Sequence, residues 1–281
     1  MITNQNFLKP LLLCSSLALA ACVGDQAVNL ETRPIALDQS ASLAGEASGS
    51  NAATVAQLQP TTSPTYVTLT VAQSDATTIQ AASNAPTTPI TSGSGFIVSS
   101  DGYVVTAAHV AVAVGNEISA RAANERIYTG VVSAIDRAND MALIKLRTYN
   151  GRAVVPSAPA CMAKEALVFT YGKPHGRGDT QRLGSLRAMH FGRPVTYGNY
   201  GYSDAMVLHM GTERGESGGP VFNGQGQLVG MVVSTLSDEA GKSITLAHAQ
   251  HSNTIARFIC AHGVCPAGWQ ALAAKPVDSC G

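Results

Sequence analysis

Hydrophobic and polar positions divide the chain into three stretches with different patterns. Residues 11–21 form an uncharged, mostly apolar run, residues 22–89 are dominated by small and hydroxylated residues, and short apolar runs separated by turn residues begin after residue 92. EISARAA, RIYTGVVSAI and MALIKLR follow one another at intervals of roughly ten residues, and ALVFTYG, AMVLHM and QLVGMVVS come later. Such spacing is typical of an antiparallel sandwich or barrel and not of alternating βαβ units. We therefore predict an all-β domain.

Three local signals refine this prediction. Asp101-Gly102 stands between GFIVSS and YVVTAAH, which predicts a tight hairpin. SNTIARFICAH, near the end of the chain, predicts a helix with Ser252 or Asn253 as its N-cap. Upstream, TYVTLTV (65–71) alternates apolar residues with threonines, so it predicts either an edge strand of the domain or a transient extended segment.

The first 21 residues are typical of an export signal. Lys9 is their one positive charge, and the apolar run after it is too short to span a bilayer, which takes about 20 residues. Leu19-Ala20-Ala21-Cys22 resembles the lipobox of bacterial lipoproteins, in which the cysteine is acylated and becomes the mature amino terminus. The alternative is an ordinary signal peptide in which Cys22 is incidental.

Residues 22–89 contain too little apolar surface to offset the entropy of ordering, so we predict a flexible tether with a reach on the order of 45 Å. An acylated Cys22 would fix this tether to a membrane. Val23 follows in place of the aspartate that marks inner-membrane retention in many Gram-negative bacteria. We therefore expect a lipid-anchored protein of the bacterial cell envelope, at the outer membrane and facing the periplasm or the cell surface.

Charge and composition argue against several other functions. The 281 residues carry 18 Lys and Arg against 18 Asp and Glu, and no basic stripe favours nucleic acid. No glycine-rich phosphate loop lies between a strand and a helix, so we predict no cofactor. His248 and His251 could meet at helical spacing, but carboxylates are lacking near them in the sequence, so we predict no metal site.

Apart from Cys14 and Cys22, four cysteines remain: Cys161, Cys260, Cys265 and Cys280. In an exported chain they predict two disulfides, with three possible connectivities. No C-x-x-C pair suggests zinc or redox chemistry. Because Cys265 and Cys280 bracket a tail with little core of its own, we favour pairing these two with each other and Cys161 with Cys260.

The stretch RGESGGPVFNGQGQLVGMVVS, residues 214–234, sets Ser217 among glycines. Glycine is preferred where the backbone takes positive φ or approaches another group closely. The string GESGG also fits G-x-S-x-G, the nucleophile elbow of α/β-hydrolases. That elbow needs a helix directly after it, whereas a proline and a predicted hairpin follow here. We therefore reject the hydrolase interpretation.

Two upstream stretches supply the partners that a serine nucleophile needs. VVTAAHV places His109 at the end of a predicted strand, and NDMALIKL places Asp140 directly before another. In this order the motifs TAAH, DMALIKL and GESGGP resemble those of trypsin-like (chymotrypsin-fold) serine peptidases. SGSGFIVSSDGYVVTAAHV and SNTIARFI are most similar to bacterial and HtrA-type members. The resemblance covers about residues 92–262, and we recognise no PDZ-like segment after it.

The resemblance implies two antiparallel six-stranded β-barrels, with an active site in the cleft between them and a helix at the C-terminal end. The peptidase domain would cover residues 90–265. Barrel one would lie at about 90–150 and barrel two at about 160–252. A C-terminal tail would occupy 266–281.

The resemblance also implies a role for each site residue. His109 would take the proton from Ser217 as the serine attacks, and Asp140 would orient the imidazole. The N–H groups of Gly215 and Ser217 would form an oxyanion hole, where each donor typically contributes about 3 kcal/mol. Glu216 replaces the aspartate of the animal enzymes, so we expect no activation by zymogen cleavage. It would pair with an arginine or face solvent.

By the same resemblance, the substrate pocket would have Gly211 and Thr212 at its base and Val233, Ser234 and Thr235 in its wall. None of these residues is charged, which favours a small or aliphatic residue at the P1 position of the substrate. We predict a serine endopeptidase that cleaves proteins in the cell envelope through an acyl-enzyme. The alternative is a catalytically idle relative whose cleft binds peptides or a partner protein.

Overall fold

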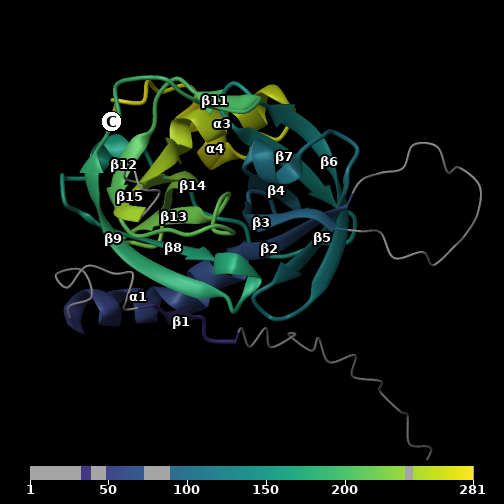
Figure 1. The fold of residues 1–281 in the computed structure, drawn as a ribbon, viewed down its shortest axis with the longest axis horizontal. Coiled ribbons are helices and arrows are strands. Elements are labelled where there is room, and N and C mark those ends of the chain that lie inside the picture. The colour runs from purple at the N-terminus through teal and green to yellow at the C-terminus, as the bar shows by residue number, and fades with distance from the viewer. Residues whose placement is uncertain (1–32, 39–48, 73–88, 238–242, 281) are drawn as a thin grey trace, which may run out of the picture. The chain divides into compact units, whose positions relative to one another are not determined.

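The computed structural model describes residues 33–38, 49–72, 89–237 and 243–280. Residues 1–32, with the expected export signal and lipidation site, lie outside this description. None of the helices in the described ranges is long and apolar enough to cross a membrane. Strands dominate these ranges and form two closed barrels that follow one another along the sequence (Figure 1).

Barrel one closes six antiparallel strands into a ring. In order around the ring they are β2 (Tyr66–Ala72), β3 (Pro89–Ile97), β4 (Tyr103–Thr106), β7 (Met141–Leu146), β6 (Ile127–Asp136) and β5 (Glu117–Ala122). The sequence MALIKL of β7 is buried at five of its six positions, as expected for a nearly continuous apolar run covered on both faces. Gly102 turns the chain between β3 and β4 with a φ of +94°, which confirms the predicted hairpin.

Barrel two is a second ring of six antiparallel strands. In order they are β8 (Leu167–Gly172), β9 (Thr180–Ala188), β12 (Met206–His209), β15 (Ser243–His251), β14 (Leu228–Ser237) and β13 (Pro220–Asn223), and β13 pairs with β8 to close the ring. The two-residue strand β1 (Ala36–Leu37) adds to β9 in parallel. A separate hairpin of β10 (Val195–Tyr197) and β11 (Tyr200–Tyr202) lies on the connection from β9 to β12. The predicted fold class is confirmed.

Helices are few and lie mainly near the two ends of the domain. They are α1 (Gly49–Thr62), α2 (Ala108–Ala111), α3 (Ser252–Ala261) and α4 (Ala267–Ala273), with 3₁₀ turns at Ser63–Thr65, Pro159–Cys161 and Pro174–Gly176. The helix α3 confirms the predicted one, although its N-cap is His251 and not Ser252 or Asn253. The helix α4 was not predicted. Its Trp269 is buried, and the indole N–H donates to the carbonyl of Val98 at 3.2 Å.

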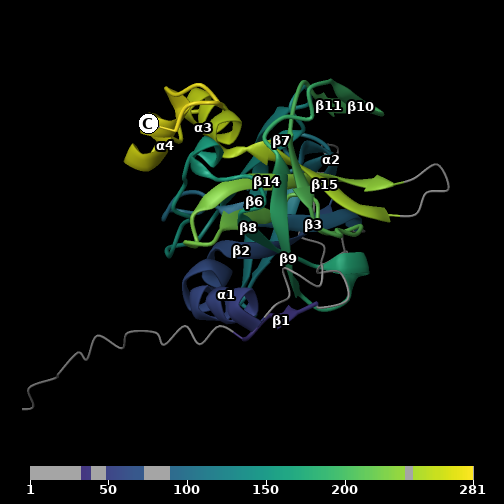
Figure 2. The ribbon, with the colours of Figure 1, turned by 90° about the vertical axis from the view of Figure 1, so that its left-hand side faces the viewer.

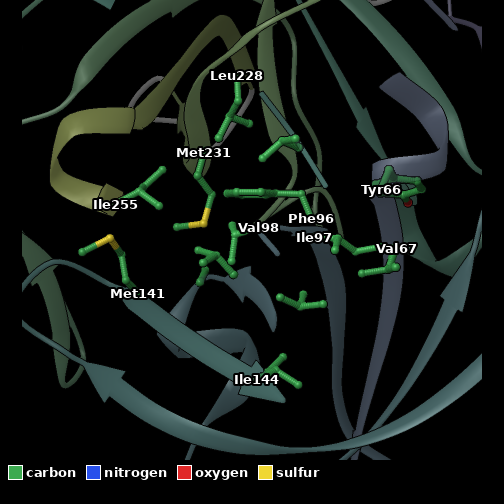
Figure 3. Packing of buried hydrophobic residues seen from close by; sticks show 14 of the residues in the cluster. Tyr66, Val67, Phe96, Ile97, Val98, Met141, Ile144, Leu228, Met231 and Ile255 are labelled. Atoms are coloured by element: carbon green, nitrogen blue, oxygen red, sulfur yellow. The ribbon is translucent and has the colours of Figure 1, made fainter. Parts of the chain in front are cut away.

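One buried cluster joins the two barrels and α3. Figure 3 shows Phe96 of β3, Met141 of β7, Met231 of β14 and Ile255 of α3 within it. Burying a side chain of this size typically stabilises the fold by about 1.5–3 kcal/mol. Because the barrels share this core, the residues at their junction are held on a common scaffold.

Two segments of the expected tether are structured. The strand β2 pairs with β3 on one side and with β5 on the other, so barrel one begins at Tyr66 and not near residue 90, and β2 is not an edge strand. The helix α1 lies beside β1 (Figure 2), where the amide of Gln59 donates to the carbonyl of Ile35 at 2.7 Å. Thr62, the last residue of α1, shares a hydrogen bond of 2.8 Å with the Tyr171 hydroxyl of β8.

The four cysteines form two disulfides, as predicted, but the favoured pairing is wrong. Cys161 is bonded to Cys280, and Cys260 to Cys265. Gly263, with a φ of +79°, turns the chain directly after α3 and returns Cys265 to the end of that helix. Cys280 is then left to pair with Cys161, and this bond links the end of the chain to the segment just before barrel two.

Candidate active site

His109 and Asp140 meet at the end of barrel one. His109 lies in the single-turn helix α2 after β4, and Asp140 directly precedes β7 with a φ of +49°. The Nδ1 of His109 is 2.8 Å from Oδ2 of Asp140, and the backbone N–H of His109 donates to Oδ1 at 3.0 Å. Asp140 is fully buried, whereas the His109 side chain is 28% exposed. Two donors from one residue therefore fix the carboxylate against the imidazole.

A third donor to Asp140 comes from Tyr197, which sequence reasoning missed. The Tyr197 hydroxyl donates to Oδ2 of Asp140, and its ring contacts that of His109 edge-on at 5.8 Å. Burial and the Asp140 charge raise the pKa of Tyr197, so it remains a donor. The string VTYGNYGY has a Gly-Asn turn between aromatic residues, which is typical of a hairpin. That signal does not reveal that the hairpin reaches a residue of barrel one.

Ser217 lies in the loop before β13, close to the histidine. The backbone N–H of Ser94 in β3 donates to the carbonyl of Ser217 at 2.9 Å, and a Cβ on Gly218 would lie 3.0 Å from the backbone nitrogen of Ala107. This loop of barrel two therefore packs against barrel one beside His109. Among the described residues, the Ser217 hydroxyl makes no hydrogen bond. Catalytic hydrogen bonds often tighten only when substrate binds.

The backbone of the serine loop presents two free donors. The N–H groups of Gly218 and Gly219 donate to backbone carbonyls at 2.8 and 2.9 Å, whereas those of Gly215 and Ser217 have no acceptor within the described ranges. The carbonyl of Arg214 accepts from His175 N–H at 2.7 Å, which turns the Gly215 N–H of the same peptide the opposite way. Both predicted oxyanion donors are therefore available to a ligand.

Only glycine fits position 215. Gly215 has a φ of +99°, and an added Cβ would lie 2.4 Å from the carbonyl oxygen of Lys173. The Ser94 hydroxyl donates to the carbonyl of Gly215 at 2.9 Å, which fixes the next peptide from the barrel-one side. The glycines around Ser217 therefore serve the shape of this loop.

Glu216 pairs with an arginine and does not face solvent. The Nε of Arg182 lies 2.6 Å from Oε1 of Glu216, and both side chains are fully buried. Burial raises the pKa of Glu216, against the opposing effect of the Arg182 charge. Arg182 also contacts Asp38, which follows β1, at 3.0 Å and Glu213 at 3.5 Å. The charge that holds the serine loop thus comes from β9, not from a freed amino terminus.

The residues predicted for the substrate pocket come from the chain just before the serine loop, at Gly211 and Thr212, and from β14, at residues 233–235. The hydroxyls of Thr212 and Thr235 share a hydrogen bond of 2.7 Å, and Gly211 is buried beside Thr212. Val233 points into the common core and would offer only its backbone. Ser234 shares a hydrogen bond of 2.8 Å with the Tyr202 hydroxyl.

A buried histidine lies behind Ser234. The Tyr202 hydroxyl also lies 2.6 Å from Nδ1 of His248, and burial lowers the pKa of His248. The ring is therefore neutral near pH 7 and adds no charge there. His248 and His251 lie in β15 and not in a helix, so the expected helical spacing between them does not exist.

Comparison with known proteins agrees with this geometry. Two six-stranded barrels with a His-Asp pair from one and a glycine-framed serine from the other define the class of trypsin-like serine peptidases. Residues 93–231 match the family described as trypsin-like peptidase domain, and this range contains His109, Asp140 and Ser217.

Individual relatives belong to the HtrA group. The chain is 30% identical over 164 residues to mitochondrial serine protease HTRA2 of Bos taurus, covering 56% of this chain and 34% of the relative. It is 28% identical over 193 residues to a probable periplasmic DegP-like serine endoprotease of Bartonella henselae, covering 67% and 37%. The chain thus spans about a third of the length of these relatives. The inactive form of the Rv3671c protease has the same fold, with a TM-score of 0.58 at 21% identity, over 82% of this chain and 100% of that one.

Proposed function

We propose that the chain is a serine endopeptidase that cleaves protein substrates through an acyl-enzyme. The observation that carries this proposal is the pairing of the His109–Asp140 contact with two unoccupied backbone donors at Ser217. His109 accepts the Ser217 proton through Nε2 during attack on the peptide carbonyl, because its Nδ1 is engaged by Asp140. The same proton then passes to the leaving amine.

The serine loop stabilises the negative charge that develops on the substrate during the reaction. The carbonyl oxygen becomes an oxyanion in the tetrahedral intermediate, where the N–H groups of Gly215 and Ser217 stabilise it. Asp140 stabilises the imidazolium that forms on His109 and keeps the ring in the tautomer that the reaction requires. No step needs a metal ion or an organic cofactor.

Replacement of Ser217 tests the proposal directly. Ser217→Ala should abolish casein cleavage and labelling by a fluorophosphonate probe, with an unchanged circular dichroism spectrum. Parent protein that is folded but takes up no probe would favour the alternative function, an idle cleft that binds peptides. An alanine variant that cleaves as fast as the parent would exclude the triad.

The Thr212–Thr235 contact supports a small P1 residue. It joins the two predicted sides of the pocket, so a large side chain cannot enter between them without breaking this hydrogen bond. Peptides with P1 alanine should be cleaved faster than matched peptides with P1 phenylalanine. Thr235→Gly should reduce that preference, and an unchanged preference would place the pocket elsewhere.

The proposed site of action is the bacterial cell envelope, with lipid anchoring at Cys22 and an outer-membrane destination. The lipobox-like LAAC sequence, the named periplasmic relatives and the two disulfides support this proposal. Metabolic palmitate labelling should disappear in Cys22→Ser. Unlabelled protein recovered wholly in the soluble periplasmic fraction would contradict the anchor.

A further inference from the structure

Two histidines and an aspartate meet outside the catalytic triad. His190 follows β9, Asp204 lies just before β12, and His251 is the last residue of β15. One possible ligand atom of each lies within 4.8 Å of the other two. His251 is buried, and the other two side chains are 40% and 31% exposed, so the cluster has a closed inner side and a path to solvent.

Each member also makes a hydrogen bond to a group outside the cluster. The Nε2–H of His251 donates to the carbonyl of Met189 at 2.7 Å, which leaves its Nδ1 with a free lone pair. Oδ1 of Asp204 accepts the N–H groups of Phe191 and Gly192 at 3.0 and 3.1 Å, so Oδ2 is the outward oxygen.

His190 has the same arrangement. Its Nε2 lies 2.5 Å from Oδ1 of Asp278, and its Nδ1 faces Oδ2 of Asp204 in a hydrogen bond. A carboxylate on the outer nitrogen of a histidine is the usual support for a metal ligand, because it fixes the ring and increases its basicity. Backbone groups support the other two members, so all three possible ligands have a partner outside the cluster.

We propose that His190, Asp204 and His251 bind a divalent transition metal ion, with zinc as the preferred ion. Two imidazole nitrogens and one carboxylate oxygen suit zinc, and a water completes the fourth position. The metal replaces the proton between His190 and Asp204. That proton leaves to solvent, and neutral His190 binds through Nδ1 while its Nε2–H donates to Asp278.

The proposed metal site lies where the two ends of the loop that carries Tyr197 come together, and we call this place the neck of the loop. His190 and Asp204 flank residues 191–203. The two ends of this loop are already joined by one backbone hydrogen bond, from the N–H of Phe191 to the carbonyl of Ala205 at 2.8 Å. A metal ion between the two sides would fix the hairpin of β10 and β11. Since Tyr197 reaches Asp140 from that hairpin, the ion is a structural support for the catalytic carboxylate.

The site also involves the C-terminal tail. Asp278 belongs to the last residues of the chain, which the Cys161–Cys280 disulfide fixes to barrel two. This covalent link keeps the Asp278 carboxylate near His190. The metal would therefore join the hairpin neck, the start of α3 and the tail.

Zinc binding is tested on the full chain carrying Ser217→Ala, so that neither autolysis nor peptidase activity enters the measurement. After dialysis against EDTA, titration calorimetry with zinc chloride should give one site per chain. Cobalt(II) should give the visible absorption of a tetrahedral N/O site. At a hundredfold excess of zinc over Kd, Tm should rise by about 5–10 °C.

The ligands are tested against a matched histidine. His190→Gln, at a half-exposed position, should remove the cobalt spectrum and the zinc-dependent rise in Tm. His262→Gln, on the same protein but outside the cluster, should keep both. The proposal is overturned if zinc does not bind, or if His190→Gln binds zinc with the affinity of the parent. Asp278→Asn should weaken binding about 10- to 100-fold, as for other lost supports of a metal ligand.

Discussion

The buried pair of Arg182 and Glu216 allows a sharp test of how the serine loop is held. Arg182→Met retains much of the side-chain volume but removes the guanidinium, so Glu216 stays buried without its partner. Glu216 directly precedes Ser217, and its Oε2 accepts the backbone N–H of Glu213 at 2.5 Å. We therefore expect Arg182→Met both to distort the serine loop and to lower the stability of the fold.

The size of the stability loss in Arg182→Met follows from the burial of the ion pair. Removing one partner of a buried ion pair typically costs about 3–5 kcal/mol, because the remaining charge is left uncompensated. For a domain of this size each kcal/mol lowers Tm by about 2–4 °C, so Arg182→Met should lower Tm by about 6–20 °C. Asp38→Asn should cost only about 1 kcal/mol or less, because the Asp38 side chain is 28% exposed and its attraction to Arg182 is screened by water.

Calorimetry and urea unfolding at pH 7 measure these differences in the Ser217→Ala background. The double variant Arg182→Met with Glu216→Leu replaces the ion pair by an apolar pair and should recover at least half of the lost stability. With Ser217 intact, fluorophosphonate labelling should slow in Arg182→Met, because the oxyanion donors flank Glu216.

Two outcomes would refute this reasoning. The first is an Arg182→Met variant as stable as the parent, which would show that the buried carboxylate needs no partner. The second is a double variant whose loss of unfolding free energy equals the sum of the losses in Arg182→Met and Glu216→Leu. That result would assign the cost to packing and not to the uncompensated carboxylate.

Three further predictions follow from the site and the tail. Gly215→Ala should lower kcat about 100-fold or more with a smaller change in KM, because one oxyanion donor is displaced; equal kcat in steady-state assays would exclude this donor. Tyr197→Phe should lower the free energy of unfolding by about 1.5–3 kcal/mol, since buried Asp140 loses a donor, and urea unfolding would show it. Replacing both Cys161 and Cys280 by alanine opens a loop of 119 residues and should cost about 4–5 kcal/mol, and a loss below 1 kcal/mol would contradict the chain-entropy argument.

The sequence was most informative where chemistry depends on a short motif. His109 and Asp140 were identified from five or so neighbouring residues each, and the structure brings them into contact. The free N–H groups around Ser217 likewise follow from a local glycine pattern. The fold class followed from strand spacing together with the family resemblance. These features are encoded locally, so a single sequence carries them.

Features that depend on contacts between distant segments could not be predicted. Tyr197 reaches Asp140 from a hairpin 57 residues further along the chain. Arg182 lies 34 residues before Glu216, so the sequence left its partner open. The disulfide pairing depends on the turn after α3, and the cluster around His190 uses three separate segments. Only the closed fold reveals these contacts.

The position of β2 has a consequence for any shortened form of the chain. This strand pairs with β3 from Tyr66 to Ala72 and with β5 from Val67 to Ala72. A chain that started at Pro89 would keep every catalytic motif but would open the ring and expose two long rows of unpaired backbone groups. Exposed edges of this kind recruit strands from other molecules. A minimal domain drawn around the catalytic motifs alone would therefore tend to aggregate through these edges, whereas one that starts before α1 would keep β2 in the ring and both edges paired.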